Sequence, residues 1–224
     1  LRTGVTDVHL SHCLFDGYSI GFIAQRLNER ITIDKCRFYN ATYIPSLISG
    51  GYGIVLQASK DTQITNNYFD ESVQRHQIYV SRNQQYPNDV GYNHVIANNI
   101  FKGENKEEYA TGFEYRIKIM GNQNATVTTN VFDGGVGHVM VVSNGAVDPH
   151  CKNIVVTNNT FMNLYRGSSN NSGAFISNAG SIIENLIVAN NVIRDCDAHF
   201  GIRLDMTVNS KIDNNLIVGT PKMF

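Results

Sequence analysis

The chain repeats one short pattern of hydrophobic and polar positions along almost its whole length. The clearest copy is KNIVVTNNTFMN, residues 152–163, in which a hydrophobic stretch is followed by a polar pair and then by another hydrophobic residue. Eight copies align on that last hydrophobic residue, here called the anchor: Phe15, Phe38, Phe69, Phe101, Phe132, Phe161, Ile193 and Ile217. Successive anchors are 23 to 32 residues apart. Recurrence at this period is typical of a repeat protein.

Two further columns accompany the anchors. Five positions earlier stand Leu10, Ile33, Ile64, Ile96, Val127, Val156, Val188 and Ile212. Two positions earlier stand Cys13, Cys36, Asn67, Asn99, Asn130, Asn159, Asn191 and Asn215. Alternate residues of a strand share a face, so two inward residues five positions apart need a bend between them. Asparagine suits such a bend, because it tolerates the left-handed conformation and its amide can bond nearby backbone or an identical amide in the next copy.

Each repeat is therefore a strand, an asparagine corner and a second strand. This pattern predicts an all-β fold, a parallel β-helix solenoid of about eight coils with an Asn ladder. Asparagine-rich loops of a β-sandwich are the alternative, but they do not explain eight columns in register. With 224 residues and 42% hydrophobic content, we expect one domain over residues 1–224 with a substantial core. Because the chain opens without Met and ends on a coil without a cap, we expect a fragment of a longer protein.

Charge and cysteine usage narrow the function classes. The net charge of −1 argues against a nucleic-acid partner. The sequence has no run of 18 apolar residues, so we expect no membrane insertion. Cys13 and Cys36 occupy the corner column, which predicts stacked reduced thiols, with a disulfide between them as the alternative. Cys151 and Cys196 have no metal-ligand spacing, so we predict no metal and no other cofactor.

The second strands of the coils form their own columns. Inward alternation is predicted for Ile78 and Val80, Ile117 and Ile119, Val139 and Val141, and Ile202 and Leu204. By parity, the outward positions are Tyr79, Lys118, Met140 and Arg203, with Gln77, Arg116 and His138 beside them and Arg75 and Glu114 one step earlier. Neighbouring coils lie about 4.8 Å apart, so equivalent residues are direct neighbours. We therefore expect one outer-wall patch made of Arg75, Tyr79, Glu114, Arg116, Lys118 and His138.

Two interpretations of this patch stay open. Stacked Glu with Arg or Lys is an ordinary way to cover a solvated sheet face. Three stacked cations with one carboxylate exceed what neutralisation needs, however, and favour an anionic ligand such as an acidic or phosphate-bearing polymer. A separate column, Asp70, Lys102 and Asp133, alternates in sign and is interpreted as structural packing.

The motifs add a resemblance. The NNxF coils, which cover almost the entire chain, resemble the pectate-lyase-like right-handed β-helix superfamily, and RHQIYVSRN at residues 75–83 resembles segments of its phage tail-spike and cell-wall-directed members. His76, followed one coil later by Arg116-Ile117-Lys118, is also similar to the GHG and RIK motifs of polygalacturonase-type glycosidases, although the Asp pair of that family is missing before His76. The resemblance implies a polysaccharide partner, an extracellular or virion-associated location and a homotrimer. Lyases of the superfamily use Arg or Lys as base, and Lys118 has the matching setting.

Two classes of function follow. The first is degradation of an anionic cell-surface glycopolymer, capsular or teichoic-acid in type, by a glycoside hydrolase or a polysaccharide lyase. Hydrolysis needs two carboxylates, whereas elimination needs one base and a cation that stabilises an enolate. The catalytic candidates are Glu114, His76, Lys118 and His138, with Asp148 or Asp205 as a possible second carboxylate, and the substrate-binding candidates are Arg75, Tyr79, Arg82, Arg116 and Arg203.

The second class is a non-catalytic carbohydrate-binding or structural shaft. Its stacking surfaces would be Tyr18, Tyr52, Tyr79, Tyr86, Tyr92 and Tyr115. If the outer wall does not bind a polymer, the site is expected in the loops at 40–52 and 84–92, because solenoid insertions gather on one face.

Overall fold

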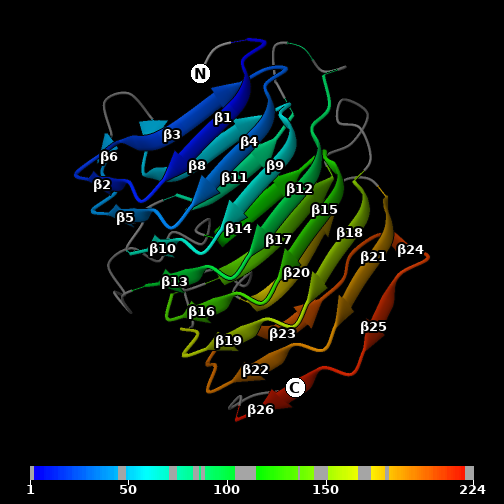
Figure 1. The fold of residues 1–224 in the computed structure, drawn as a ribbon. Helices are drawn as coiled ribbons and strands as arrows, with labels where there is room; N and C mark the ends of the chain where they lie inside the picture. The colour runs from blue at the N-terminus through cyan, green and yellow to red at the C-terminus, as the bar shows by residue number, and fades with distance from the viewer. Residues whose placement is uncertain are drawn as a thin grey trace.

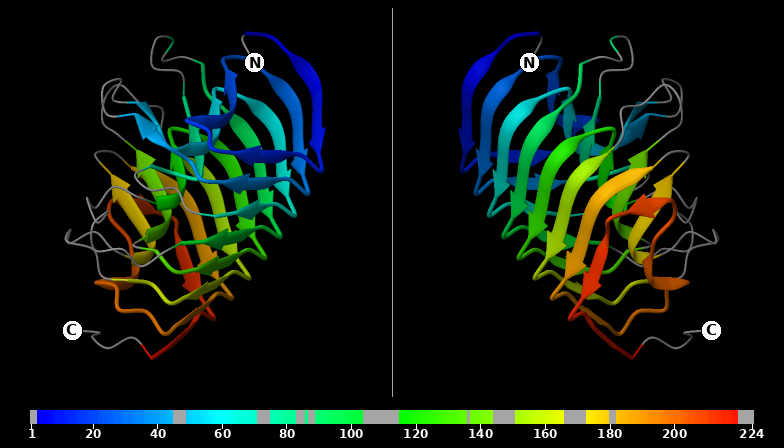
Figure 2. Two further views of the ribbon diagram at one scale, coloured as in Figure 1. Left: turned by 90° about the vertical axis from the view of Figure 1, so that its left-hand side faces the viewer. Right: turned by 90° about the vertical axis from the view of Figure 1, so that its right-hand side faces the viewer.

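The computed structural model shows three parallel sheets that the chain visits in turn, so that each circuit forms one coil (Figure 1). It describes residues 3–44, 49–70, 75–82, 86, 89–103, 115–135, 137–143, 151–165, 173–179 and 182–219. Among these residues, no helix is long and apolar enough to cross a membrane. The side views show the strands of successive coils stacked from the N-terminal to the C-terminal end (Figure 2). This arrangement confirms the predicted parallel β-helix.

The strand bounds follow the repeat. Sheet A contains β1 (Thr6–Ser11), β4 (Glu29–Asp34), β9 (Lys60–Thr65), β12 (Tyr92–Ala97), β15 (Gln123–Thr128), β18 (Lys152–Thr157), β21 (Ile183–Ala189), β24 (Thr207–Val208) and, beside β21, β25 (Lys211–Asp213). Sheet B contains β2 (Leu14–Asp16), β5 (Arg37–Tyr39), β10 (Tyr68–Phe69), β13 (Ile100–Lys102), β16 (Val131–Asp133), β19 (Thr160–Met162), β22 (Val192–Arg194) and β26 (Leu216–Val218). Sheet C contains β3 (Ile20–Gln25), β8 (Tyr52–Gln57), β11 (Ile78–Ser81), β14 (Tyr115–Met120), β17 (Gly137–Ser143), β20 (Gly173–Ala179) and β23 (Phe200–Arg203). A short antiparallel hairpin joins β6 (Tyr43–Ile44) to β7 (Ser49–Gly50).

The anchors form the centre of the core. Six phenylalanine rings stack face to face through successive coils of sheet B, with centroids 4.6 to 4.9 Å apart: Phe15, Phe38, Phe69, Phe101, Phe132 and Phe161. The rings from Phe38 onward are fully buried. Each contributes a large buried apolar area as well as a ring contact, so this column is a major source of stability.

The predicted Asn ladder is present between sheets A and B. The Nδ2 of Asn130 donates to the Oδ1 of Asn159 at 3.0 Å and to the carbonyl of Ile96 at 2.9 Å, and the backbone N–H of Asn130 also donates to the Oδ1 of Asn159. The same three bonds recur at Asn67, Asn99, Asn159 and Asn191. The buried corner thus has its polar groups satisfied by the next coil.

The residue with the left-handed backbone conformation in each corner is not the ladder asparagine itself. It is the residue just before it, with φ between 49° and 58°: His12, Lys35, Asn66, Asn98, Thr129, Asn158, Asn190 and Asn214. The prediction that the ladder asparagine makes the bend was therefore wrong in position, because its side chain must point inward to reach the next amide. The four cysteines are free, as predicted for Cys13 and Cys36. The Oδ1 of Asn67 accepts the N–H of Cys36 at 2.8 Å, where the ladder begins.

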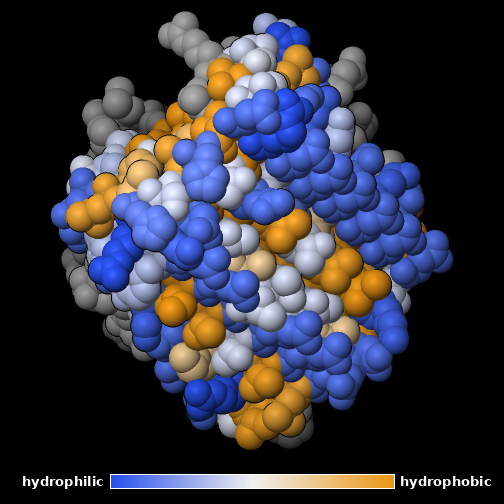
Figure 3. All heavy atoms as spheres, viewed as in Figure 1, coloured by the Kyte–Doolittle hydropathy of each residue, from blue (hydrophilic) through white to orange (hydrophobic). Residues whose placement is uncertain are grey.

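Columns of like residues also mark the outside. Lys102 and Asp133 form the ion pair expected of the alternating column on sheet B. On sheet A, the exposed amides of Asn93, Asn124, Asn153 and Asn185 hydrogen-bond from coil to coil and end on Asp61. In the space-filling view, hydrophilic and hydrophobic residues lie in bands across the coils (Figure 3). Parts of the surface are therefore organised in columns, as the core is.

Candidate functional site

The outer wall expected from the sequence is sheet C, and its register agrees with the prediction. Tyr79 pairs with Lys118, Lys118 with Met140, Met140 with Ile176, and Ile176 with Arg203. The residues predicted to face inward are buried in the core or, at the last coil, packed against it: Ile78, Val80, Ile117, Ile119, Val139, Val141, Ile202 and Leu204. The inward half of the alternation is thus confirmed.

The outward half of that alternation is wrong at Arg116 and Gln77. Arg116 is only 7% exposed, and its guanidinium occupies the space next to Gly103 and Gly135, where a Cβ at either glycine would collide with it. Gln77 is 2% exposed and donates through Nε2 to the carbonyl of Lys102 at 3.3 Å. Both side chains turn into the corner between sheets B and C. Strict alternation fails here because two successive residues, 116 and 117, face inward as the chain bends into the sheet.

The bend moves the preceding residues onto the outer face and creates an aromatic cluster around His76. Its ring centroid lies 5.4 Å from that of Tyr79, 6.0 Å from Tyr52 and 6.5 Å from Tyr115. The Nδ1 of His76 lies 3.0 Å from the carbonyl oxygen of Tyr115, to which it donates in the tautomer protonated at Nδ1. Burial, with a further effect of the Lys118 charge, lowers the pKa of His76 to about 3. His76 is therefore a neutral ring at the base of the cluster.

Lys118 and Arg75 supply the positive charge of the cluster. The Nζ of Lys118 lies 5.7 Å from the centroid of the Tyr79 ring, within cation–π range. Burial, followed by repulsion from Arg75, lowers the pKa of Lys118 below its ordinary value of 10.5. Burial raises the pKa of Tyr79 to about 12, so its hydroxyl stays protonated at neutral pH. Lys118 and Tyr79 thus place an amine that loses its proton more readily than usual beside a protonated phenol.

The other predicted site residues are dispersed. Arg82 is 8% exposed at the end of β11. Arg203 lies three strands beyond β14 and pairs with Asp205, with 2.8 Å between Nη2 and Oδ2. Glu114 and Asp148 lie outside the described residues, as does the side chain of His138, whose backbone is part of β17. The described wall therefore brings together Arg75, His76, Tyr79 and Lys118.

Between Lys118 and Arg203 the wall is apolar. Tyr115, Met140 and Ile176 are buried on the outer face of sheet C and pack together, with Val142 and Phe200 against them. Burial raises the pKa of Tyr115 beyond its usual range. Tyr115 is 3% exposed, so it does not offer the sugar-stacking surface expected of it. Tyr52 does reach the cluster, where its ring stacks 5.8 Å from that of Tyr79.

Sequence reasoning missed the contribution of Gly51 to this site. Gly51 has φ +76°, and a Cβ there would contact the Cβ and Cγ of Arg75 at 3.4 Å. Glycine adopts this positive φ without the strain that a side chain would add. Its equivalence to Arg75 could have been found by aligning the coils on sheet C rather than on the anchors. Within the described part of the chain, no group of three or more His, Cys, Asp or Glu side chains is placed to hold a metal ion.

Comparison with protein families agrees with this architecture. The family model for the right-handed beta helix region matches residues 21–217. The chain belongs to this family. The match covers every coil from β3 to β26 and gives the solenoid the right-handed sense that the resemblance implied. No curated protein matches the chain.

Proposed function

We propose that this right-handed β-helix binds an anionic cell-surface glycopolymer across the outer face of sheet C and degrades it. The observation that supports this most directly is the cluster that Arg75 and Lys118 form with His76, Tyr52 and Tyr79. These residues lie on the adjacent strands β8, β11 and β14 or, for Arg75 and His76, just before β11. Cations recognise carboxylates through charge-assisted bonds, and aromatic rings bind the apolar faces of sugars. A capsular or teichoic-acid polymer, an extracellular or virion-associated location and a homotrimer belong to the same proposal.

Elimination is the chemistry that the described residues favour over hydrolysis. In this step the neutral amine of Lys118 takes the proton from the carbon next to a uronate carboxylate, and the freed electron pair forms a carbon–carbon double bond. The bond from the neighbouring carbon to the leaving sugar oxygen breaks, and that oxygen takes the proton of the Tyr79 hydroxyl. Arg75 stabilises the charge that develops on the carboxylate. The lowered pKa of Lys118 supports this role, since an amine base must be unprotonated.

Two substitutions at one position separate catalysis from binding. Lys118→Arg keeps a cation that never loses its proton, so we expect binding of an oligouronate within threefold of wild type and turnover reduced by at least about 100-fold, within the usual range for general-base loss. Lys118→Met removes the charge as well, so we expect binding to weaken about tenfold. Binding is measured by calorimetry and turnover by the ultraviolet absorbance of the unsaturated product.

The same experiment tests the non-catalytic shaft as the alternative. If wild type binds acidic polymers and forms no unsaturated or reducing ends, the domain is a binding module. If Lys118→Met binds and processes every acidic polymer as wild type does, the cluster on sheet C is not the site. Glu114→Gln addresses hydrolysis, because loss of turnover with binding retained would assign an acid or base role to Glu114.

A further inference from the structure

A groove of about 710 Å³ lies on a different wall from the cluster, over the corner between sheets A and B in the first coils. One side is formed by the corner residues His12, Lys35 and Asn66, and the other by the strand residues Leu14, Arg37, Tyr68 and Ile100. Cys13 and Cys36 line it between the two sides. The strand residues are successive register partners, so at about 4.8 Å per coil the groove spans about 14 Å.

The residues of this groove differ from those at the equivalent positions of the later coils. The corner column continues as Asn98, Thr129, Asn158, Asn190 and Asn214. The strand column continues as Val131, Thr160, Val192 and Leu216. Both continuations are uncharged, whereas the first coils place the cations Lys35 and Arg37 at these positions. The repeat does not require cations there, so they need a local explanation.

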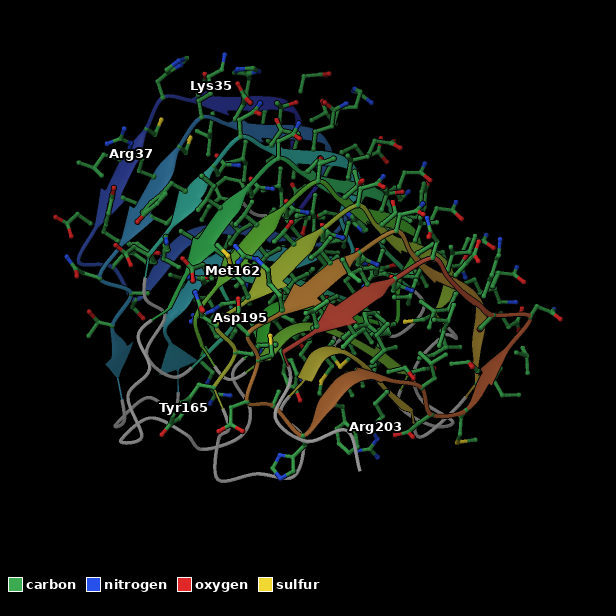
Figure 4. The ribbon with its side chains drawn as sticks, turned by 90° about the horizontal axis from the view of Figure 1, so that it is seen from below. Lys35, Arg37, Met162, Tyr165, Asp195 and Arg203 are labelled. Atoms are coloured by element: carbon green, nitrogen blue, oxygen red, sulfur yellow. The ribbon has the colours of Figure 1, made fainter. Side chains whose placement is uncertain are left out.

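Arg37 stands out among the cations of sheets A and B. In the described parts of these two sheets, the lysines and the other arginines pair with carboxylates, as Arg30 does with Asp7, Lys152 with Glu184 and Arg194 with Asp195. Arg37 is exposed, and within the part of the chain that the structure describes its guanidinium has no hydrogen bond or ion pair. Lys35 is near Asp34, at 3.7 Å, and its side chain is 56% exposed. Figure 4 shows Lys35 and Arg37 on the same outer edge of the helix, with Arg203 on the opposite side.

Aromatic and apolar surfaces accompany these cations. The rings of Tyr39 and Tyr68 lie 5.6 Å apart at 36° on neighbouring coils. Leu14 is 66% exposed and Ile100 41%, so apolar side chains flank Arg37 and Tyr68 along the column. A guanidinium beside two tyrosine rings matches a ligand that has a carboxylate on an apolar ring face. The carboxylate of Asp34 accepts bonds from Thr65 and Asn66, which hold it at the edge of the groove.

We infer that this groove is a second glycan subsite, which holds an acidic sugar residue of the polymer away from the cluster on sheet C. The inference rests on the proposed function for its ligand class, a uronate-containing chain. Arg37 binds the sugar carboxylate, Lys35 adds a second cation, and Tyr39 and Tyr68 contact the sugar ring. A subsite on another wall would keep a long polymer bound while one segment is processed, because two linked contacts raise the overall affinity.

The test uses a galacturonate trimer, which is too short to contact two walls at once. In the wild-type chain, labelled at its tyrosine rings, we expect the NMR signals of Tyr39 and Tyr68 to shift on addition of the trimer. Arg37→Gln should weaken the affinity measured from these shifts at least tenfold. Arg194→Gln, an exposed arginine of the same sheet that is paired with Asp195, is the matched control and should leave the affinity unchanged. A neutral trimer of the same length should shift neither signal.

The two proposals fail separately. If millimolar galacturonate trimer leaves the signals of Tyr39 and Tyr68 unmoved, or if Arg37→Gln binds as wild type does, the groove is not a glycan subsite, whatever happens on sheet C. If inorganic phosphate shifts the same signals as strongly as the trimer, the groove is a general anion site and the inference is also overturned. Lys118→Met should leave the groove affinity unchanged, so its effect on polymer binding and turnover reports on the proposed function alone.

Discussion

At the scale of single residues, the most consequential contacts are the amides of the buried ladder. Each ladder asparagine in the middle of the stack satisfies a backbone carbonyl, a backbone N–H and a neighbouring amide, and Asn130 is 1% exposed. A buried donor or acceptor left without a partner costs its full desolvation free energy. A change at one rung therefore affects the rung on each side as well.

Replacing Asn130 by Leu should lower the free energy of unfolding by about 1–3 kcal/mol, because it removes the donor to the carbonyl of Ile96 and the acceptor that the backbone N–H and the side-chain amide of Asn99 share. Asn159→Leu should behave alike. Asn215→Leu is the matched control, since Asn215 ends the ladder and is only half-buried, and it should cost less. Urea unfolding monitored by circular dichroism measures the three values. Equal losses at all three positions would contradict a cooperative ladder.

At the scale of elements, the corner between sheets B and C decides what sheet C displays. Gly103 follows β13, Gly134 and Gly135 follow β16, and the guanidinium of Arg116 fills the space beside Gly103 and Gly135, while Gly134 packs against the backbone of Gly103. Gly135 has φ +94°, a conformation that other residues adopt only with strain. The glycines and the arginine thus form one packed unit that supports the start of β14.

We predict that Gly135→Ala destabilises the fold by about 2–4 kcal/mol, because the strain of positive φ adds to the collision with Arg116. Gly4→Ala is the control for the backbone alone, since Gly4 has φ +75° with no atom within 4 Å of an added Cβ. In an Arg116→Ala background, Gly135→Ala should cost no more than Gly4→Ala does. The double-mutant cycle, measured by chemical unfolding, would oppose this account if the cost of Gly135→Ala were the same with and without Arg116.

Arg116→Ala alone should also destabilise the protein. The sequence predicted an exposed side chain at Arg116, and its burial makes that prediction wrong. Parity assigns faces only within a straight strand. Since the bend at residues 116 and 117 has no signature in hydrophobicity, charge patterning alone could not separate Arg116 from Lys118.

At the scale of the whole molecule, the sequence predicted the fold far better than it predicted the surface. Anchors and ladder residues recur because each must meet its own copy one coil later, so the columns from Phe38 to Phe161 could be read without a structure. The aromatic cluster depends on the path by which the segments before β8, β11 and β14 return to sheet C. These segments differ in length from coil to coil, so the alignment of the repeats does not predict that path. The two columns that line the groove at Arg37 lie one and three positions before the anchors and could have been aligned from the sequence, but the space between them appears only in the structure.

The buried histidines should make the stability of the whole solenoid fall in mild acid. Burial lowers the pKa of His94 to about 4, although its Nε2 lies 3.3 Å from the Oδ1 of Asn122, which accepts a hydrogen bond, and burial lowers that of His76 to about 3. Between about pH 6.5 and pH 4 the unfolded chain protonates both rings while the folded chain protonates neither. The unfolded state then binds more protons, so the free energy of unfolding should drop by about 1.4 kcal/mol per pH unit for each histidine as the pH falls.

His94→Gln should reduce this slope by half, from about 2.8 to about 1.4 kcal/mol per pH unit, because one of the two titrating groups is removed. The substitution also removes the hydrogen bonds of His94 with Thr62 and Asn122, which lowers the free energy of unfolding equally at every pH and so does not change the slope. His9→Gln, at an exposed position of β1, is the control for removing a histidine. The carboxylates with lowered pKa values, Asp7, Asp34 and Asp133, lose most of their contribution to stability below their ordinary pKa of 3.8, and so below this window. Urea unfolding at half-unit steps of pH gives the slopes. Identical slopes for wild type and His94→Gln would show that His94 is not held neutral by burial.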